Sequence, residues 1–449
     1  MASAPSSPDR PTDPRPVTHP LQIPAFRAFL AVRLCTILGS SGMSIIIAWQ
    51  AYNIARLTMP PAQAAAQLGL IGLIQFVVLF LVTPFAGLAA DNYKRTRIGM
   101  ITLSLLLGCA GVLALASYEG WIGLPLIFAI AAALGFARAF QGPALGSLAP
   151  NIVPKEMLPR AIAFSSMVWQ AGSIVGPAVA GYAYALESYY AYMISAGLFL
   201  VSVLGLVLVG EVRQAPPQRG RHPIRQVIDG LSYVRTNRLV FGAITLDLFA
   251  VLLAGTTALL PVYARDILHI GSEGLGHLAA APGIGAGLTA LIFSFRPLRH
   301  NVGLKMLLSV GVFGIATITF GLTAFMPSGI AMPVALLAMA VWGCADMFSV
   351  FVRQSLIQLH TPDEMRGRVS SVSMMTISAS NELGDAESGF LAALIGPVAA
   401  VILGGAGAIL ITLYWSRLFP ELKRARTFDP PEGLHLAHPP TPPATAGPS

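Results

Sequence analysis

The stretch VPKEMLPR (153–160) returns as TPDEMRGR (361–368), 208 residues further along the chain. The two stretches share Pro, Glu, Met and Arg at matching positions. The same shift carries glycines onto glycines: Gly135 onto Gly343, Gly176 onto Gly384 and Gly181 onto Gly389. Self-similarity at a fixed shift indicates an internal repeat. The sequence therefore predicts two parallel copies of one structural unit.

Long apolar runs surround both copies of this stretch. A helix needs about 20 apolar residues to cross the roughly 30 Å hydrocarbon layer of a membrane, and twelve segments are long enough. Their predicted limits are 28–53, 67–90, 98–118, 121–146, 160–185, 189–210, 238–264, 274–295, 302–325, 331–357, 369–394 and 396–419. We predict an all-α polytopic membrane protein whose twelve transmembrane helices form two pseudo-symmetric six-helix bundles. In such repeats the substrate site lies between the bundles near mid-membrane.

Composition and charge agree with a membrane protein and argue against nucleic-acid binding. The chain is 55% hydrophobic and 11% charged, with a mean hydropathy of +0.70, whereas a soluble domain has about 25% charged residues. The formal charge of +8 is spread thinly between apolar runs, without the dense basic patch that binds nucleic acid.

If the N-terminus is cytoplasmic, only Arg56 and Arg265 fall on the outer side. Because basic residues are retained inside, we predict that both termini are cytoplasmic.

The chain divides into five predicted parts. Residues 1–24 and 427–449 are rich in Pro and small or polar residues, so we expect disordered cytoplasmic tails there. The two six-helix bundles are predicted at 25–210 and 238–426. The cytoplasmic loop between them, 211–237, has apolar residues at helical spacing, which predicts a short interfacial helix.

No catalytic, metal-binding or phosphate-binding constellation stands out in the sequence. Cys35, Cys109 and Cys344 lie in separate apolar segments without metal-ligand spacing. Most of the eight His residues lie in tails or loops, and the chain has no phosphate-binding loop ending in Gly-Lys-Ser/Thr. We therefore expect no enzyme activity, no metal, no cofactor and no direct use of ATP.

Ionisable residues inside predicted membrane helices are costly and mark functional positions. The candidates for proton coupling or substrate binding are Arg138, Asp247, Asp346, Arg353, Glu382 and Asp385. Asp346 occupies the repeat position of Arg138, so the pseudo-two-fold axis would bring these opposite charges together. Such a pair is either a gate that forms in one conformation or a permanent structural pair.

Three acids in the second half have alternative interpretations. Asp247 lies near the middle of the seventh predicted helix, where it could carry the coupling proton, bind a cationic substrate group or make a polar contact with a neighbouring helix. Glu382 and Asp385 share one helix face, and two nearby carboxylates favour proton binding or a basic substrate. The alternative is a wet, locally irregular helix around Gly384 and Gly389.

The loop after the second predicted helix reads GLAADNYKRTR (87–97). It resembles the signature that the major facilitator superfamily carries between its second and third helices, and the residues that fit are Gly87, Asp91, Arg95 and Arg97. The resemblance implies a conformational latch at this loop. Asn92 and Lys94 depart from the usual pattern, and an ordinary basic loop is the alternative.

Two further segments are similar to signatures of the same superfamily. The fourth predicted helix has Leu134, Arg138, Gln141 and Gly142 in the order of a motif typical of proton-driven members, although a structural Arg bound to carbonyls is the alternative. The fifth has a stretch similar to the antiporter motif, through Gly172, Gly176, Pro177 and Gly181. Together these motifs imply proton antiport and favour export over uptake.

A closer resemblance is to the enterobactin-exporter-like branch of this superfamily, through HPLQIPAFRAFLAVR (19–33), RHPIRQVIDGLSYV (221–234) and TPDEMRGR (361–368). It implies a monomeric secondary active transporter of the bacterial inner membrane. We expect a proton-coupled antiporter that exports a small drug-like, siderophore-like or metabolite molecule by alternating access. Its partners would be the substrate, protons and the lipid bilayer. The alternatives are a proton-coupled symporter that imports a nutrient and a non-transporting scaffold or sensor.

Overall fold

The computed structural model describes residues 19–146, 148–210, 223–296, 298 and 300–428. Most of the predicted N-terminal tail, the start of the central loop and most of the predicted C-terminal tail lie outside these residues. Within the range predicted as N-terminal tail, His19 caps a short 3-10 helix, η1 (Pro20–Gln22), and α1 already begins at Pro24. Residues 20–22 and 24, which we predicted to belong to a disordered tail, are therefore helical.

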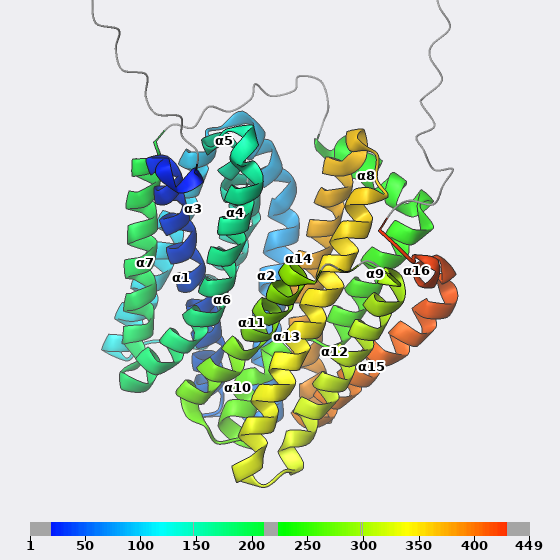
Figure 1. Ribbon diagram of the computed structural model, residues 1–449. Coiled ribbons are helices and arrows are strands. Elements are labelled where there is room, and N and C mark those ends of the chain that lie inside the picture. The colour runs from blue at the N-terminus through cyan, green and yellow to red at the C-terminus, as the bar shows by residue number, and fades with distance from the viewer. Residues whose placement is uncertain (1–18, 147, 211–222, 297, 299, 429–449) are drawn as a thin grey trace, which may run out of the picture.

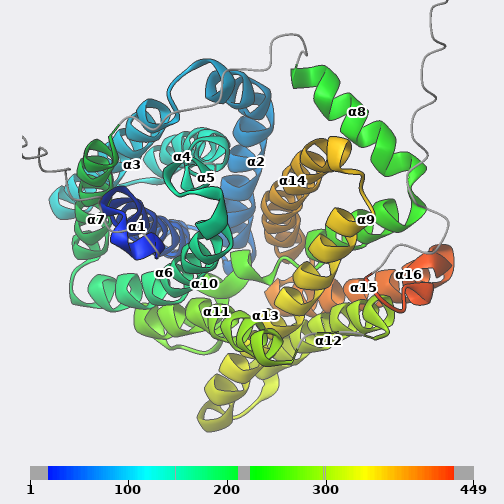
Figure 2. The same ribbon diagram turned by 45° about the horizontal axis from the view of Figure 1, so that its top comes forward.

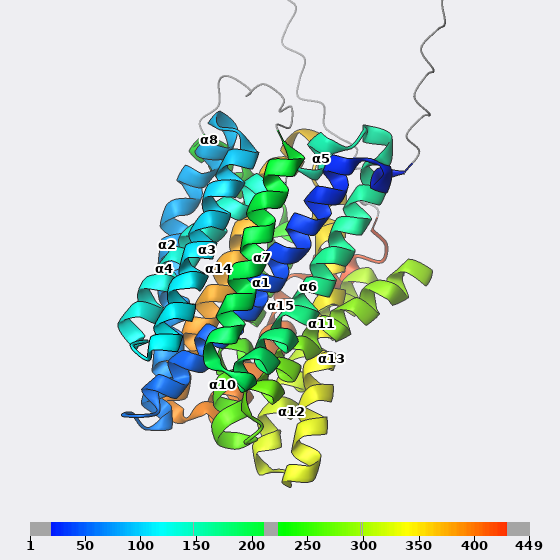
Figure 3. The same cartoon turned by 90° about the vertical axis from the view of Figure 1, so that its left-hand side faces the viewer.

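The first half of the chain forms one helical bundle (Figure 1). Its helices are α1 (Pro24–Ala55), α2 (Pro61–Asn92), α3 (Arg95–Glu119), α4 (Leu124–Leu145), the short α5 (Ala149–Ile152), η2 (Lys155–Met157), α6 (Leu158–Leu186) and α7 (Ser188–Val209). Figure 3 shows α1 lying between α6 and α7, and both packings are extensive.

The second half forms a matching bundle. Its helices are α9 (Arg238–Leu253), α11 (Gly271–Phe295), α12 (Val302–Leu322), η5 (Thr323–Phe325), α13 (Ser328–Leu359), α14 (Asp363–Ile395), α15 (Pro397–Leu418) and α16 (Pro420–Arg424). The span that starts with α9 continues through the short segments η3 (Thr256–Leu259), α10 (Leu260–Val262) and η4 (Tyr263–Ile267). In η4 the backbone is a π-helix, a rare form that is frequent at functional sites.

The predicted repeat is present in the helix limits. When the limits of α4 are shifted by 208 residues they become 332–353, which lies within α13. The same shift turns the limits of α6 into 366–394, which lies within α14. Each half thus uses the same order of helices, and the prediction of two pseudo-symmetric bundles is confirmed.

One of the twelve membrane helices is unusually polar. Among the described residues, eleven helices are long and apolar enough to cross a membrane. The twelfth, α14, is 33 residues long and lies between α2 and α9 (Figure 2). Its acidic residues Glu382, Asp385 and Glu387 lower its hydropathy.

The linker helix α8 (Pro223–Thr236) packs against α14 (Figure 2). Asp229 accepts a hydrogen bond of 3.0 Å from Arg368 Nη1 of α14. Val234 is buried, whereas Ile228 and Leu231 are exposed. A helix therefore forms where the loop pattern predicted one, with part of its apolar face left uncovered.

The two halves contact each other closely at one end of the molecule. We call the end that holds Pro24 and Leu418 the tail face, and the end that holds Ala55 and Gly271 the far face (Figure 1). Towards the far face α6 packs on α11, and α2 packs on α14. Glycines permit this approach: a Cβ added at Gly276 would lie 2.8 Å from the carbonyl oxygen of Pro177. The contacts between the halves at this end thus depend on glycine.

We predict that Gly276→Leu destabilises this conformation, because the added side chain would press on the α6 backbone of the other half. Overpacking of this kind costs roughly 1–3 kcal/mol. Gly111→Leu is the matched control, since nothing lies within 4 Å of a Cβ added there. The apparent melting temperature of each purified variant in detergent measures the effect. Equal melting temperatures for the two variants would contradict the importance of this contact.

Candidate functional site

An ion pair joins the two halves near the middle of the molecule. Arg138 of α4 contacts Glu382 Oε1 of α14 through its Nη1 atom, and the same nitrogen lies 3.4 Å from Gln75 Oε1 of α2. The side chain of Arg138 is 46% exposed and that of Glu382 is 9% exposed. The arginine is therefore accessible to a solute, while the carboxylate is held inside the protein.

Asp385 lies one turn after Glu382 on α14 and contacts a different element. Its Oδ1 accepts a hydrogen bond of 2.9 Å from the Thr257 hydroxyl of η3. Gly72 of α2 lets α14 come close, because a Cβ added there would lie 3.1 Å from both the Asp385 Cβ and the Glu382 carbonyl oxygen. The acidic stretch of α14 is thus in contact with the first half through Glu382 and with its own half through Asp385.

A second ion pair lies entirely within the second half. Arg353 of α13 contacts Asp247 Oδ1 of α9, and the two side chains are only 2% and 8% exposed. Breaking such a buried pair by removing one partner costs on the order of 3–5 kcal/mol. Asp346, two turns before Arg353 on α13, lines a small cavity together with Asp247.

The expected pair between Asp346 and Arg138 is not formed in this conformation. Arg138 contacts Glu382 instead, and Asp346 lies beside α9 and α12 inside its own bundle. In this conformation α14 packs on α2 and places Glu382 beside Arg138. The absence of the pair here rules out a permanent structural pair, whereas a gate that forms in another conformation stays a prediction, because repeat symmetry alone does not specify which helix of one half packs on the other.

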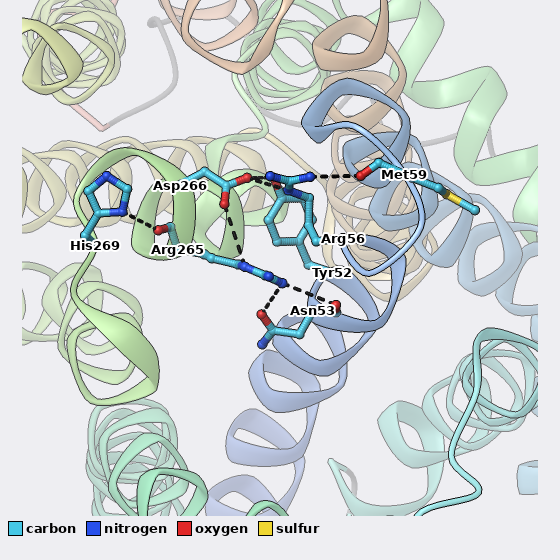
Figure 4. Close-up of polar contacts among 7 residues, drawn as sticks. All are labelled: Tyr52, Asn53, Arg56, Met59, Arg265, Asp266 and His269. Atoms are coloured by element: carbon cyan, nitrogen blue, oxygen red, sulfur yellow. Dashed lines mark hydrogen bonds and ion pairs between the residues drawn. The ribbon is translucent and has the colours of Figure 1, made fainter.

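A third charged cluster joins the halves at the far face (Figure 4). Asp266 of η4 accepts hydrogen bonds from the Tyr52 hydroxyl, at 2.5 Å, and from Arg56 Nε, at 2.9 Å; both donors belong to the first half. Arg265, the neighbour of Asp266, donates from Nη1 to Asn53 Oδ1 at 2.6 Å. We call these five residues the far-face clasp. The clasp ties the end of α1 in the first half to η4 in the second half.

Of this cluster, only Arg56 and Arg265 stood out in the sequence, as exceptions to the charge distribution. The sequence signal for this cluster was a pair of arginines on a face with few other charges, one of them next to an acid. The π-helix at η4, which brings Asp266 to Tyr52, has no sequence pattern of its own. Thr257 and Gln75, the partners of Asp385 and Arg138, were also missed.

The motif residues occupy distinct places in the structure. Gly172 and Gly176 of α6 face α1 of the same half, whereas Gly181 faces Ser272 and Gly276 of α11. Pro177 lies within α6 between these contacts. The antiporter-like stretch therefore serves two helix interfaces, one inside the first half and one between the halves.

The other motif residues are arranged as follows. Leu134 is buried in α4, and a Cβ added at Gly142 or at Gly87 would meet nothing within 4 Å. One side-chain nitrogen of Gln141 is buried without a hydrogen-bond partner. Arg95 and Arg97 lie in the first turn of α3, and the Asp91 side chain lies outside the described part of the chain. The latch expected at this loop therefore stays a prediction.

The described residues contain no group of three or more His, Cys, Asp or Glu side chains that could hold a metal ion. The three cysteines in the described residues are free thiols. In this part of the chain, the carboxylate–arginine pairs with buried or half-buried side chains include Arg138–Glu382 and Arg56–Asp266, which join the two halves, and Arg353–Asp247, which lies inside the second half. Ionisable residues inside membrane helices commonly mark ion and substrate pathways.

Known proteins with similar sequences are transporters. Enterobactin exporter EntS of Citrobacter koseri is 28% identical over 434 residues, which cover 92% of this chain and 96% of the relative. The protein of the same name from Escherichia coli is 27% identical over 424 residues, covering 91% and 94% of the two chains.

Solved structures share the fold at lower identity. A bacterial homolog of the human lysosomal transporter Spinster, in an inward-facing and occupied conformation, has a TM-score of 0.67 and 13% identity, covering 88% of this chain and 97% of that chain. The D-xylose-proton symporter also has a TM-score of 0.67, at 14% identity over 89% and 98% of the two chains. The sequence model of the Major Facilitator Superfamily matches residues 29–384. This protein is therefore a multi-pass membrane transporter that belongs to the Major Facilitator Superfamily.

Proposed function

We propose that this transporter is a proton-coupled antiporter that exports a small organic molecule across the bacterial inner membrane by alternating access. The observation that carries the proposal is the Arg138–Glu382 ion pair between the two halves. An ion pair that spans the moving parts of a transporter changes its strength with the protonation of its acid. Protons and substrate can therefore control the same movement.

The tail face is assigned to the cytoplasm, because it carries most of the basic residues, which are retained on that side. The far-face clasp then closes the outer side. In the conformation described above the substrate enters from the cytoplasm. The outward-facing conformation forms when the clasp and the far-face helix contacts separate.

The coupling follows from competition for Arg138 and Glu382. In the inward-facing state the ionised Glu382 binds Arg138 and holds the halves together. A substrate with a charged or strongly polar group replaces one partner of this pair, which permits the change to the outward-facing state. After the substrate leaves, a proton from outside neutralises Glu382, and the return step delivers that proton to the cytoplasm. Asp385, one turn away, is the second proton acceptor in this scheme.

The energy of one proton is sufficient for export. A charge moving through 100 mV supplies about 2.3 kcal/mol, and a tenfold substrate gradient costs about 1.4 kcal/mol. The direction is inferred from the relatives named as enterobactin exporters. We infer a siderophore-like, drug-like or metabolite substrate, and a monomer as the working unit.

Glu382→Gln is expected to abolish coupled export, because the amide neither ionises nor forms an ion pair with Arg138. A deletion strain carrying each variant would be grown on a panel of toxic compounds and chelators. We expect the protection given by the wild-type protein to fall at least about tenfold, the equivalent of 1.4 kcal/mol. Glu421→Gln is the matched control, since it breaks the 2.8 Å pair with Arg238 inside one half.

Inverted membrane vesicles then test the direction of transport with the compound found in the panel. Accumulation driven by an inward proton gradient supports export. Efflux that continues after a protonophore has collapsed the gradient would refute proton coupling, and accumulation in intact cells instead would indicate an uptake symporter.

Asp266→Asn is expected to open the far face more often, because the neutral amide binds Arg56 and Tyr52 less strongly. Hydrogen bonds to charged groups contribute about 1.5–3 kcal/mol, so the open population should rise about tenfold or more. The measurement uses a protein whose own three cysteines are replaced and which carries a new cysteine at Ser272, a position that is 7% exposed. The rate at which a maleimide labels this cysteine reports how often the far face opens. Labelling as slow as in the Glu421→Gln control would mean that the clasp does not hold the far face closed.

A further inference from the structure

A small cavity lies among α9, α12 and α13 of the second half. Three polar residues line it: Asp247 of α9, and Asp346 and Ser349 of α13. Its other walls are apolar, and Val310 and Phe313 of α12 close one side. The cavity measures about 10 Å³, which is close to the smallest space that holds one water molecule.

Two of the polar groups on this cavity have no partner in the protein. Among the described residues, neither the Asp346 carboxylate nor the Ser349 hydroxyl has a hydrogen bond or ion pair with another residue. Ser349 is nevertheless only 5% exposed. Leaving a buried polar group unsatisfied costs about 1–3 kcal/mol, and buried water commonly removes that cost by making two to four hydrogen bonds.

The spacing of the residues places these groups along one line. Asp346, Ser349 and Arg353 lie at positions i, i+3 and i+7, which share one face of α13. Arg353 binds Asp247, and Asp247 lines the same cavity as Asp346 and Ser349. A water in this space is within reach of two carboxylates and one hydroxyl.

We propose that this cavity holds one ordered water that bridges Asp346 to the Asp247–Arg353 pair, and that these groups form a proton-binding site separate from Glu382 and Asp385 inside the second half. With both acids ionised, the site has two negative charges and one positive charge. One bound proton makes it neutral. Its role in transport rests on the proposed function, whereas the water and the proton are properties of the cavity itself.

The proton moves through the water without any net change in it. Protonated Asp346 donates its proton to the water oxygen, and the water gives one of its own protons to the ionised Asp247. Asp346 becomes the carboxylate, Asp247 becomes the neutral acid, and the water is restored. Asp247 then no longer attracts Arg353 as an ion, so the proton's position sets the strength of the buried pair.

Few other ionisable groups face this site. The α12 wall is apolar. On the side of α13 towards α11, Cys344 donates its thiol hydrogen to the carbonyl oxygen of Gly285. On α14, which packs against α9, Asp385 is bound to Thr257. The titration of the site is therefore expected to depend on Asp346, Asp247 and Arg353.

Infrared difference spectroscopy between acidic and neutral pH tests the proposal, on the full-length protein in liposomes and without substrate. In the wild-type protein we expect a carboxylic acid band that is lost in Asp346→Asn. We also expect an O–H band of bound water that shifts in H₂¹⁸O. This water band should disappear in Ser349→Val, whose side chain takes the space and lacks the hydroxyl.

Ser309→Val is the matched control, because that buried hydroxyl already donates to the Met306 carbonyl oxygen at 2.7 Å; it should keep both bands. Ser349→Ala is a milder variant that leaves room for the water, and it should shift the band without removing it. The proposal is overturned by a wild-type spectrum without the water band, by a water band that persists in Ser349→Val, or by an unchanged acid band in Asp346→Asn. Because no transport is measured, these outcomes are independent of whether Glu382→Gln still exports.

Discussion

The cost of an ionised side chain in apolar surroundings is the constraint on which this structure depends. Each acid placed inside the helices would be unstable alone, so the fold brings an arginine, a hydroxyl or a cavity to it. Arg138 meets Glu382, Arg353 meets Asp247 and Thr257 donates to Asp385. The same helix packing builds each of the two bundles and brings them together along α2 and α14.

The charged clusters differ in whether they lie inside one bundle or join the two bundles. The Arg353–Asp247 pair lies within one bundle and is almost fully buried, so it stabilises that bundle in every conformation in which it is ionised. The Arg138–Glu382 pair and the far-face clasp connect the two bundles. Any movement of one bundle against the other would have to change these contacts, and the proposed transport cycle uses them for that reason.

Much of the fold could be predicted from the sequence, because hydropathy, the charge distribution and the 208-residue repeat each depend on local or periodic patterns. The ionisable residues of the site could be predicted for the same reason. Their partners could not. Arg138 and Glu382 are separated by 244 positions, and only the packing of α14 on α2 makes them neighbours. The π-helix that places Asp266 beside Tyr52 is equally invisible in the sequence.

The central claim is that the ionised Glu382 holds the two halves together through Arg138. Spin labels can be attached at Ile162 on α6 and at Met374 on α14, both of which are exposed. Double electron–electron resonance then measures the distance between the two labels, and so between the halves, as a function of pH. We predict that acidification shifts the wild-type distances to those of Glu382→Gln, and that the variant shows these distances at every pH. A Glu382→Gln variant that keeps the wild-type distances and their pH dependence would contradict the account.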